Sequence, residues 1–441
     1  MGRQKIFKRF NSFLLLGIWA FLLPACDKEN NSRETKSDDD QPIVNASFEE
    51  KVTIGEANPV WKNYSWKPDK AKIEWLQGEG NNGSNCISLS STIDNDIALM
   101  QDIQLEGDEV YQLTAKVKTK NVTGGHGANI CLFGTWQSSE PLTGTNDWQQ
   151  ASLVFLTPDS GKVTIACRLG FWGATSSGKV WFDDIRIQQI DMFDRKSEHL
   201  RLRLKQEDAS VVASSTITSW LNNLDKAYEK YYELIGEYPY NGNIITIFSV
   251  DSYPGGWAVA GNPILWYRPY IQSSLMDIEN KGDWSFGILH EIGHDFAPGI
   301  GIEGNSNWNW NEEMFANFRM YYAVELLDAS VIQDKLYTGS ELKNYYRTYA
   351  GGSYENKIRK GDAEDAHDGI MYTLIRIKDQ IGWEPFKQTF RFLYQSDAEF
   401  TNNTQRFNHF LDKLSEFSGE DVRQTYPEGE LEIIEEALKN E

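Results

Sequence analysis

The pattern His290-Glu291-Ile292-Gly293-His294 places two imidazoles and one carboxylate within a short segment of the chain. Residues four apart lie one above the other on a helix face, so both histidines can bind one tetrahedral metal ion. The chain has only 6 histidines, and such a pattern arises by chance in about one such sequence in a hundred. The pattern predicts a zinc ion held by His290 and His294, with Glu291 beside its open coordination position.

A zinc ion at this position would supply the chemistry of peptide hydrolysis. Zinc lowers the pKa of a bound water molecule to about 7, and Glu291 is expected to accept the proton as the water attacks a carbonyl carbon. The same carboxylic acid can then protonate the departing amine. One alternative is that both are ordinary surface or core histidines with satisfied hydrogen bonds. Another is a merely structural zinc site, and the carboxylate of Glu291 beside an open coordination position argues against it.

A catalytic zinc ion needs a third protein ligand, for which two neighbouring glutamates compete. The pattern HExxHxxGxxH is excluded, because Ala297 and Ile300 stand where its glycine and third histidine would be. Downstream, Glu313 shares a helix face with small and apolar residues, whereas Glu312 shares one with Arg319. Because a metal ligand must point into the protein, we favour Glu313, and Glu312 stays the alternative.

The oxyanion that develops during hydrolysis needs a hydrogen-bond donor besides zinc. His367 and Tyr372, near the start of a later helical segment, are the candidates. Asp368 is placed to cap that segment, so a role in capping and packing is an open alternative for His367.

The segments around the motif are mostly helical. The helical pattern that contains the motif begins near Asp283 and ends before Pro298. Apolar residues recur at helix spacing over residues 221–235, and a buried strand is predicted over residues 244–250. Residues 206–441 are therefore predicted to form an α+β, mostly helical catalytic domain.

Residues 43–190 instead show short alternating runs separated by Gly, Asn, Asp and Ser turns. This spacing predicts an all-β antiparallel sandwich, followed by a linker over residues 191–205. Three cysteines, Cys86, Cys131 and Cys167, fall in strand-like sequence. Either all three are buried thiols, or two of them form one disulfide.

The first residues of the chain resemble an export signal. Basic residues precede the apolar run of residues 13–23, which is too short to span a bilayer as a helix. The run ends in Leu23-Pro24-Ala25-Cys26, which resembles the lipobox of bacterial lipoproteins. The resemblance implies removal of residues 1–25 and a lipid on Cys26 that anchors the protein to the outer membrane. The acidic residues just behind Cys26 resemble the surface-export signals of some Gram-negative lipoproteins, which implies a place on the cell surface. Residues 26–42 are then an acidic, disordered tether. The alternative is secretion with Cys26 free.

The composition limits the partners of the chain. It holds 43 Lys and Arg against 64 Asp and Glu among 441 residues, a net charge of -21. This balance leaves no basic stripe that could neutralise a phosphate backbone, so nucleic acid is not expected as a partner. An acidic chain is not held electrostatically on an anionic membrane either, which makes the lipid the expected anchor.

The motif at His290–His294, followed by Glu313 and by Asn317 four residues later, resembles the gluzincin arrangement, specifically that of the enhancin and mucin-targeting metallopeptidases. The resemblance covers roughly residues 244–417 and implies a zincin fold and cleavage of mucin-like glycoproteins. Zincin folds place an edge strand that pairs with extended substrate at the position of residues 257–262. An ordinary strand or hairpin of the core is the alternative for these residues.

The predicted sandwich carries a resemblance of its own. Its end segments, residues 45–49 and 178–185, resemble those of galactose-binding-like jelly rolls, which are common among carbohydrate-binding modules. The resemblance implies glycan binding. Trp136 and Trp172 lie between turn residues and could stack on sugar rings, or could instead close the ends of the sandwich core.

Such modules often carry a structural calcium ion near their chain ends, for which Glu49 and Asp184 are the candidate ligands. The leading hypothesis is thus a lipid-anchored zinc metallopeptidase whose sandwich binds the glycan of its glycoprotein substrate. Two alternatives stay open, namely a general zinc peptidase without glycan preference and a non-catalytic glycan-binding adhesion lipoprotein.

Overall fold

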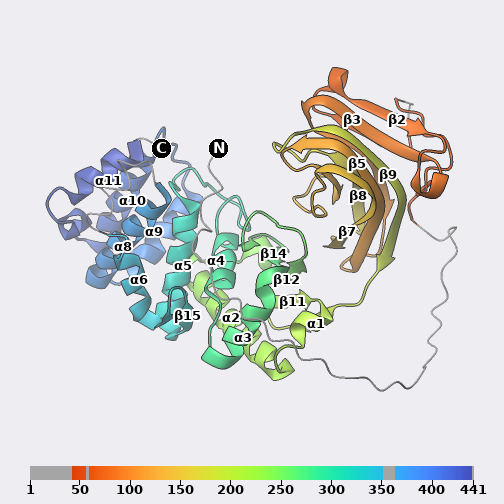
Figure 1. Ribbon diagram of the computed structural model, residues 1–441. Coiled ribbons are helices and arrows are strands. Elements are labelled where there is room, and N and C mark those ends of the chain that lie inside the picture. Colours follow the sequence, from red (N-terminus) through yellow and green to blue (C-terminus); the bar gives the residue numbers. More distant parts are fainter. Residues whose placement is uncertain (1–41, 56–58, 351–362, 440–441) are drawn as a thin grey trace, which may run out of the picture. The chain divides into compact units, whose positions relative to one another are not determined.

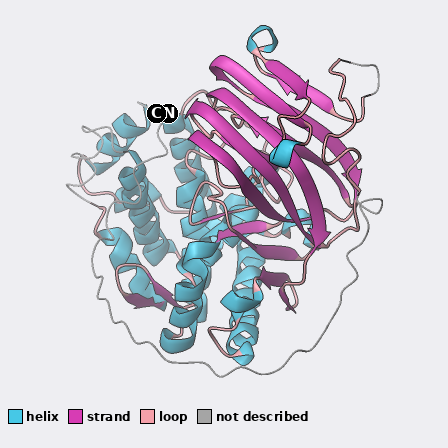
Figure 2. Cartoon of the chain, turned by 45° about the vertical axis from the view of Figure 1, so that its right-hand side comes forward, coloured by secondary structure: helices cyan, strands magenta, loops and turns pink. Residues whose placement is uncertain are grey.

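The computed structural model describes residues 42–55, 59–350 and 363–439 (Figure 1). The predicted lipidation residue, Cys26, and the predicted signal peptide lie outside these ranges. The described chain begins with strands and continues with a mostly helical part, as the sequence colours of Figure 1 show. Figure 2 shows the strands in magenta and the helices in cyan. Within these ranges no helix is both long and apolar enough to cross a membrane.

The N-terminal part is a sandwich of two sheets, in which every pair of neighbouring strands is antiparallel. This confirms the predicted all-β jelly-roll sandwich. In spatial order, the first sheet consists of β1 (Lys62–Ser65), β4 (Ile97–Gln104), β8 (Lys162–Leu169) and β6 (Ala128–Leu132). The second consists of β2 (Lys72–Leu76), β3 (Cys86–Asn95), β9 (Ser176–Gln189), β5 (Val110–Gly124) and β7 (Gly144–Leu156).

The apolar alternation of these strands fills the space between the two sheets. Leu99 of β4 and Leu169 of β8 belong to the large core cluster, whereas their neighbours Ala98 and Arg168 lie on the other face of the sheet. All three cysteines are free and buried, so the alternative with a disulfide is wrong. Burial raises the pKa of the Cys86 thiol to about 12, as expected for an unreactive core thiol.

The C-terminal part is built on a five-stranded mixed sheet. Its spatial order is β10 (Phe193–Lys196), β11 (Leu200–Leu204), β12 (Ile245–Val250), β14 (Ile264–Tyr267) and β13 (Ala258–Val259). The three central strands are parallel, and both outer strands are antiparallel to their neighbours. Residues 191–205, predicted as a linker, thus contribute β10 and β11 to this sheet. The cause is the alternating run Leu200–Leu204, whose residues are all buried.

Helices make up most of the remaining C-terminal part, which confirms the predicted α+β, mostly helical class. They are α1 (Gln206–Ala209), α2 (Ser214–Ile235), α3 (Ile271–Lys281), α4 (Phe286–Asp295), α5 (Glu312–Leu327), α6 (Lys343–Arg347), α8 (Ala363–Ile381), α9 (Glu384–Gln395), α10 (Asn403–Ser418) and α11 (Glu430–Lys439). A hairpin of β15 (Ser330–Ile332) and β16 (Leu336–Thr338) follows α5. One continuous apolar core joins the sheet to α2, α4, α5 and α8–α10.

Candidate metal centre

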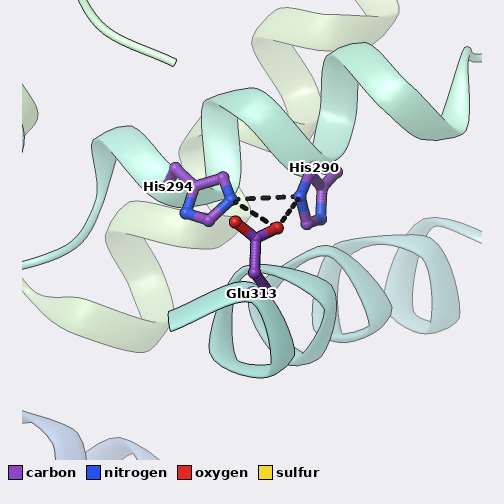
Figure 3. Close-up of side chains that lie close together, drawn as sticks. All are labelled: His290, His294 and Glu313. Atoms are coloured by element: carbon purple, nitrogen blue, oxygen red, sulfur yellow. Dashed lines mark hydrogen bonds and ion pairs between the residues drawn. The ribbon is translucent and has the colours of Figure 1, made fainter. Parts of the chain in front are cut away.

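Helix α4 carries the HExxH motif, and its boundaries follow from local chemistry. Ser285 caps the helix, because its side chain accepts a hydrogen bond from the backbone N–H of Ile288. Leu289 and Ile292 are fully buried in the core. These apolar anchors fix the rotation of α4, and this rotation turns both motif histidines toward α5 (Figure 3).

Three side-chain atoms meet between α4 and α5 (Figure 3). The Nε2 atoms of His290 and His294 lie 3.0 Å apart. Glu313 Oε2 lies 3.2 Å from His290 Nε2 and 3.4 Å from His294 Nε2. A tetrahedral ion with ligand bonds of about 2.1 Å separates its ligand atoms by roughly 3.4 Å, so the triangle has the size that a zinc ion needs. The described residues hold no other group of three candidate ligands so arranged.

The second nitrogen of each imidazole faces an oxygen acceptor. His290 Nδ1 lies 2.8 Å from Asn317 Oδ1, and His294 Nδ1 lies 3.3 Å from Glu312 Oε1. These acceptors favour the tautomer with the proton on Nδ1, which leaves a lone pair on each Nε2. Two lone pairs 3.0 Å apart repel each other unless a cation lies between them and Glu313. The donor set therefore fits a metal ion.

The electrostatics of the triangle point the same way. Burial lowers the pKa of His294, but the carboxylates of Glu312 and Glu313 outweigh burial and raise it to about 10. Hydrogen bonds to His290 and His294 lower the pKa of Glu313 below its ordinary value. The surroundings thus stabilise a positive charge at this place, which a divalent cation supplies.

The structure places Glu313 in the triangle, whereas Glu312 lies beside the Nδ1 atom of His294. The reason given for preferring Glu313 is nevertheless wrong, because the helix face of Arg319 is the buried one. Arg319 is fully buried and binds Glu312 through two hydrogen bonds, whereas the Glu313 side chain is 77% exposed. An arginine at helix spacing from a glutamate can be its buried partner, so Arg319 does not mark a solvent-exposed helix face.

Glu291, the predicted general base, is 9% exposed. Burial raises its pKa above the ordinary value, and the backbone N–H of Ala260 donates a hydrogen bond to it. Asp295, the residue after the motif, is fully buried and accepts hydrogen bonds from the Tyr240 hydroxyl and the Gly261 N–H, both at 2.8 Å. Glu291 within the motif and Asp295 directly after it therefore both bind the chain that follows β13.

Sequence reasoning missed Asp295 and Tyr240. The signal available for Asp295 was its position directly after the motif and before Phe296-Ala297, in a helix whose other residues are mostly apolar. A carboxylate there has to be buried with a donor. Nothing in the sequence around Tyr240 identifies it as that donor, because 55 residues separate it from Asp295.

The two predicted oxyanion donors, His367 and Tyr372, both lie in α8. His367 is buried, and Tyr372 packs against Arg376, whose guanidinium carbon lies 5.8 Å from the ring centroid. Helix α8 begins at Ala363, so Asp368 lies inside the helix and the alternative in which it caps the helix is wrong. An oxyanion role for His367 or Tyr372 stays a prediction.

In the sandwich, Trp136 and Trp172 lie together, with ring centroids 5.9 Å apart. Trp136 is 67% exposed, and Trp172 is partly buried with its indole N–H donating to the Thr135 carbonyl. Trp172 belongs to the cluster on the face of the first sheet that is turned away from the sandwich core, and Trp136 packs against Trp172 and Phe171 of that cluster. The alternative in which Trp136 closes an end of the core is therefore wrong.

The two predicted calcium ligands have protein partners. Glu49 accepts a hydrogen bond from the Asn85 backbone N–H at 3.0 Å, and Asp184 accepts one from the Asn81 side chain at 3.0 Å. Neither belongs to a group of three or more candidate metal ligands in the described part of the chain. A structural calcium ion stays a prediction.

Comparisons with solved structures cover both parts of the chain. A structure titled "CBM4 structure and function" is 19% identical and covers 34% of this chain and 99% of its own, with a TM-score of 0.25. TmCBM61, solved in complex with beta-1,4-galactotriose, is 18% identical and covers 34% of this chain and 99% of its own, with a TM-score of 0.25. A functionally unknown conserved protein from Bacillus anthracis str. Ames is 12% identical and covers 83% of this chain and 79% of its own, with a TM-score of 0.40.

Comparison with curated proteins and with protein families gives different results. No curated protein matches this chain. The model of one protein family, described as Peptidase M60, enhancin and enhancin-like, matches residues 171–426, which is more than half of the chain and contains the whole His-His-Glu triangle. The metal-binding geometry and the family match agree, and the chain belongs to the family Peptidase M60, enhancin and enhancin-like.

Proposed function

We propose that this protein is a zinc metallopeptidase that hydrolyses peptide bonds in glycoproteins, with mucin-like proteins as the substrate class. The triangle of His290 Nε2, His294 Nε2 and Glu313 Oε2 carries the proposal. Membership of the M60 family supports the same chemistry. When bound in the triangle, zinc supplies the Lewis acidity that activates a water molecule and polarises the scissile carbonyl.

Glu291 has the position and surroundings of a general base. It follows His290 directly on α4, and burial raises its pKa toward the range in which proton transfer is effective. As a carboxylate, Glu291 accepts one proton from the attacking water. It then gives that proton to the departing amine nitrogen as the carbon–nitrogen bond breaks, so Glu291 ends in its starting state.

Replacing Glu291 by Gln tests this role, because the amide keeps the shape of the side chain and cannot accept the proton. We expect zinc binding to be retained and glycoprotein hydrolysis to fall by at least about 100-fold. The exposed Glu303, replaced by Gln, is the matched control and should leave turnover unchanged. Undiminished hydrolysis by the Glu291→Gln variant would refute the assignment of the base.

The end of the catalytic sheet supports binding of an extended peptide. Among the described strands, β13 is the last in the order, and β14 pairs with it on one side. The chain beyond β13 continues to Ala260, which donates to Glu291. An extended peptide that adds to β13 would therefore run close to the general base.

Glycan binding by the sandwich is the second part of the proposal. An aromatic platform, made of Tyr64, Phe133, Trp136 and Trp172, covers the outer face of the sheet β1-β4-β8-β6. Neighbouring ring centroids lie 5.3 to 5.9 Å apart. Partly exposed rings held at such spacing can stack on the apolar faces of successive sugar units.

A buried ion pair supports the aromatic platform from below. The Arg168 guanidinium is fully buried, lies 4.6 Å from the Trp172 ring centroid and 5.1 Å from that of Phe133, and pairs with Asp96 at 2.6 Å. Cation–π contact and the ion pair fix the ring positions before any ligand arrives. Rings held in place in this way lose little conformational entropy on binding.

Substitution of the exposed tryptophan tests the aromatic platform. We expect Trp136→Ala to weaken retention on immobilised mucin by about 10-fold, while hydrolysis of an unglycosylated peptide is unchanged. Trp66→Ala is the matched control, since Trp66 is 59% exposed and is not part of the platform. Equal retention of both variants would count against glycan binding at this face.

The substrate class is tested by mapping cleavage products. Mass spectrometry of a mixed glycoprotein digest, before and after enzymatic deglycosylation of the substrate, reports both the cleaved bonds and their dependence on sugar. Loss of cleavage after deglycosylation supports the proposal. Unchanged cleavage favours a general zinc peptidase, and stoichiometric zinc without any cleavage favours a non-catalytic adhesion protein.

We also propose that the protein is held at the outer membrane through a lipid on Cys26, exposed at the cell surface. The support is the sequence Leu23-Pro24-Ala25-Cys26 after a short apolar run. Fatty-acid labelling of the expressed full chain should mark the wild type and leave Cys26→Ala unlabelled. Labelling of both, or of neither, would contradict the anchor.

A further inference from the structure

The two histidines of the triangle are oriented by partners of different chemistry. His290 Nδ1 faces the neutral amide of Asn317 at 2.8 Å. His294 Nδ1 faces the charged carboxylate of Glu312 at 3.3 Å. A metal-binding histidine is more basic when a carboxylate accepts its second N–H, so Glu312 strengthens His294 as a ligand.

The Glu312 carboxylate depends in turn on Arg319. Arg319 follows Glu312 by seven positions on α5, which places the two on the same helix face two turns apart. Arg319 Nη1 lies 2.6 Å from Glu312 Oε1, and Nη2 lies 3.0 Å from Oε2. This is the paired, two-bond geometry that fixes both members of a guanidinium–carboxylate pair.

Arg319 is not a surface residue. Its side chain is fully buried, and a buried guanidinium needs a partner for its charge, which Glu312 provides. A further hydrogen bond runs from Arg319 Nη1 to the Gly293 carbonyl at 2.7 Å. Gly293 lies in the last turn of α4, where carbonyl groups lack partners within the helix. Arg319 therefore binds α4 at the residue before His294 as well as through Glu312.

We propose that Arg319 is a positioning residue for the metal centre, which holds the Glu312 carboxylate against His294 Nδ1 and thereby sets the affinity for zinc. The hydrogen bonds of Arg319 go to Glu312 and to the Gly293 carbonyl, neither of which is a metal ligand or the general base. The inference rests on the proposed zinc function and adds that affinity for the metal is controlled from a residue two contacts away. Replacing Arg319 should free the His294 ring to move, while every metal ligand stays in the chain.

Three variants of the full chain separate this role from a general effect on folding. Arg319→Met leaves the partly buried Glu312 carboxylate without its cation. The unpaired carboxylate then moves away from His294 or disturbs it. The double variant E312Q/R319M removes both charges and keeps an oxygen acceptor for His294 Nδ1. The double variant E312L/R319M removes both charges and the acceptor.

The measurement is the zinc dissociation constant by competition with a chelator, together with thermal unfolding of the metal-free proteins. We expect Arg319→Met to bind zinc about 10- to 100-fold more weakly than wild type. E312Q/R319M should recover most of the affinity. E312L/R319M should bind as weakly as Arg319→Met while its metal-free form unfolds at the temperature of E312Q/R319M. Rescue of zinc binding by a second substitution is not expected of a merely structural arginine.

Three results would overturn the inference. One is zinc affinity within twofold of wild type in a folded Arg319→Met variant. Another is equal zinc affinity of E312Q/R319M and E312L/R319M. The comparison of these two variants stays valid if Arg319→Met fails to fold. A third is zinc affinity that follows unfolding temperature alone across the set. Failure of the proposed function looks different, since the wild type would then bind no zinc or would bind it without hydrolysing glycoprotein.

Discussion

A β-carbon placed on Gly293 would lie 2.8 Å from the carbonyl oxygen of Ala316, so α4 and α5 approach each other as closely as a glycine allows. His294 follows Gly293 in the chain, and Ala316 lies one helical turn after Glu313. This backbone contact therefore sets the separation between the helix that carries both histidines and the helix that carries the third ligand.

Gly293→Ala is expected to separate the two helices. The obstacle is a backbone oxygen, which cannot move aside as a flexible side chain can. We expect a loss of about 1 to 3 kcal/mol in unfolding free energy and a loss of zinc affinity of at least about 10-fold. Denaturant unfolding and chelator competition measure the two effects.

The matched control is Gly173→Ala, because a β-carbon at Gly173 meets no atom within 4 Å. This variant should match wild type in both measurements. Wild-type zinc affinity in Gly293→Ala would show that the spacing of the helices does not govern the metal centre.

Asn317 offers a second test of how the ligands are held. Its Oδ1 is the acceptor for His290 Nδ1–H, and Asn317→Leu removes that acceptor at similar volume. We expect zinc affinity to fall by about 10- to 100-fold, whereas Asn317→Asp, which keeps an acceptor oxygen, should bind zinc at least as well as wild type. Equal affinities of the Leu and Asp variants would exclude this orienting role.

Much of the metal centre follows from the spacing of residues in the sequence. The i, i+4 histidines require a helix, and the helix boundaries follow from local capping and apolar anchors. The sequence leaves two neighbouring candidates for the third ligand, Glu312 and Glu313. Glu312 differs from Glu313 because it is bound by the buried Arg319. The burial of Arg319 depends on tertiary packing against α4 and not on helix periodicity.

The sheet of the catalytic part was harder to predict for a similar reason. Residues 200–204 alternate Leu and Arg, which favours a strand with one solvent face. Both arginines are nevertheless largely buried, because Asp194 on the neighbouring strand pairs with them. Antiparallel pairing of β11 with β10, and its parallel pairing with β12, make the predicted linker part of the sheet.

Tyr240 provides a test of the buried carboxylate beside the motif. The hydroxyl of Tyr240 is one of two donors to Asp295, which is fully buried. Tyr240→Phe removes that donor and keeps the ring, so the unfolding free energy should fall by about 1 to 3 kcal/mol. Denaturant unfolding at neutral pH measures the change.

Tyr238→Phe is the control for Tyr240→Phe. The Tyr238 hydroxyl donates a hydrogen bond to the Glu229 carboxylate at 3.2 Å. Tyr238 is 37% exposed, so water can replace the lost hydroxyl. Its loss should change stability by less than about 0.5 kcal/mol. Equal effects of the two substitutions would show that Asp295 does not need its tyrosine partner.

Asp283 connects the start of α4 to the β15–β16 hairpin. Its Oδ1 accepts hydrogen bonds from the backbone N–H groups of Ser285, at 3.0 Å, and Ile332, at 3.1 Å. Burial raises the pKa of Asp283 from 3.8 to about 6 in spite of these bonds. Folding therefore favours the protonated carboxyl group, so the stability linked to this group is present in full below pH 4 and is lost as the pH rises through about 6.

Asp283→Asn should consequently be more stable than wild type at neutral pH. The amide oxygen accepts the same two backbone hydrogen bonds and carries no charge that burial would penalise. We expect a gain of about 1 to 3 kcal/mol in unfolding free energy at pH 8, which shrinks as the pH falls through 6 and disappears near pH 4. Denaturant unfolding from pH 4 to pH 8 measures it, with Asp69→Asn as the control that should show no such trend, since the Asp69 side chain is 76% exposed. A difference between Asp283→Asn and wild type that stays constant with pH would mean that the charge of Asp283 is not what burial penalises at the start of α4.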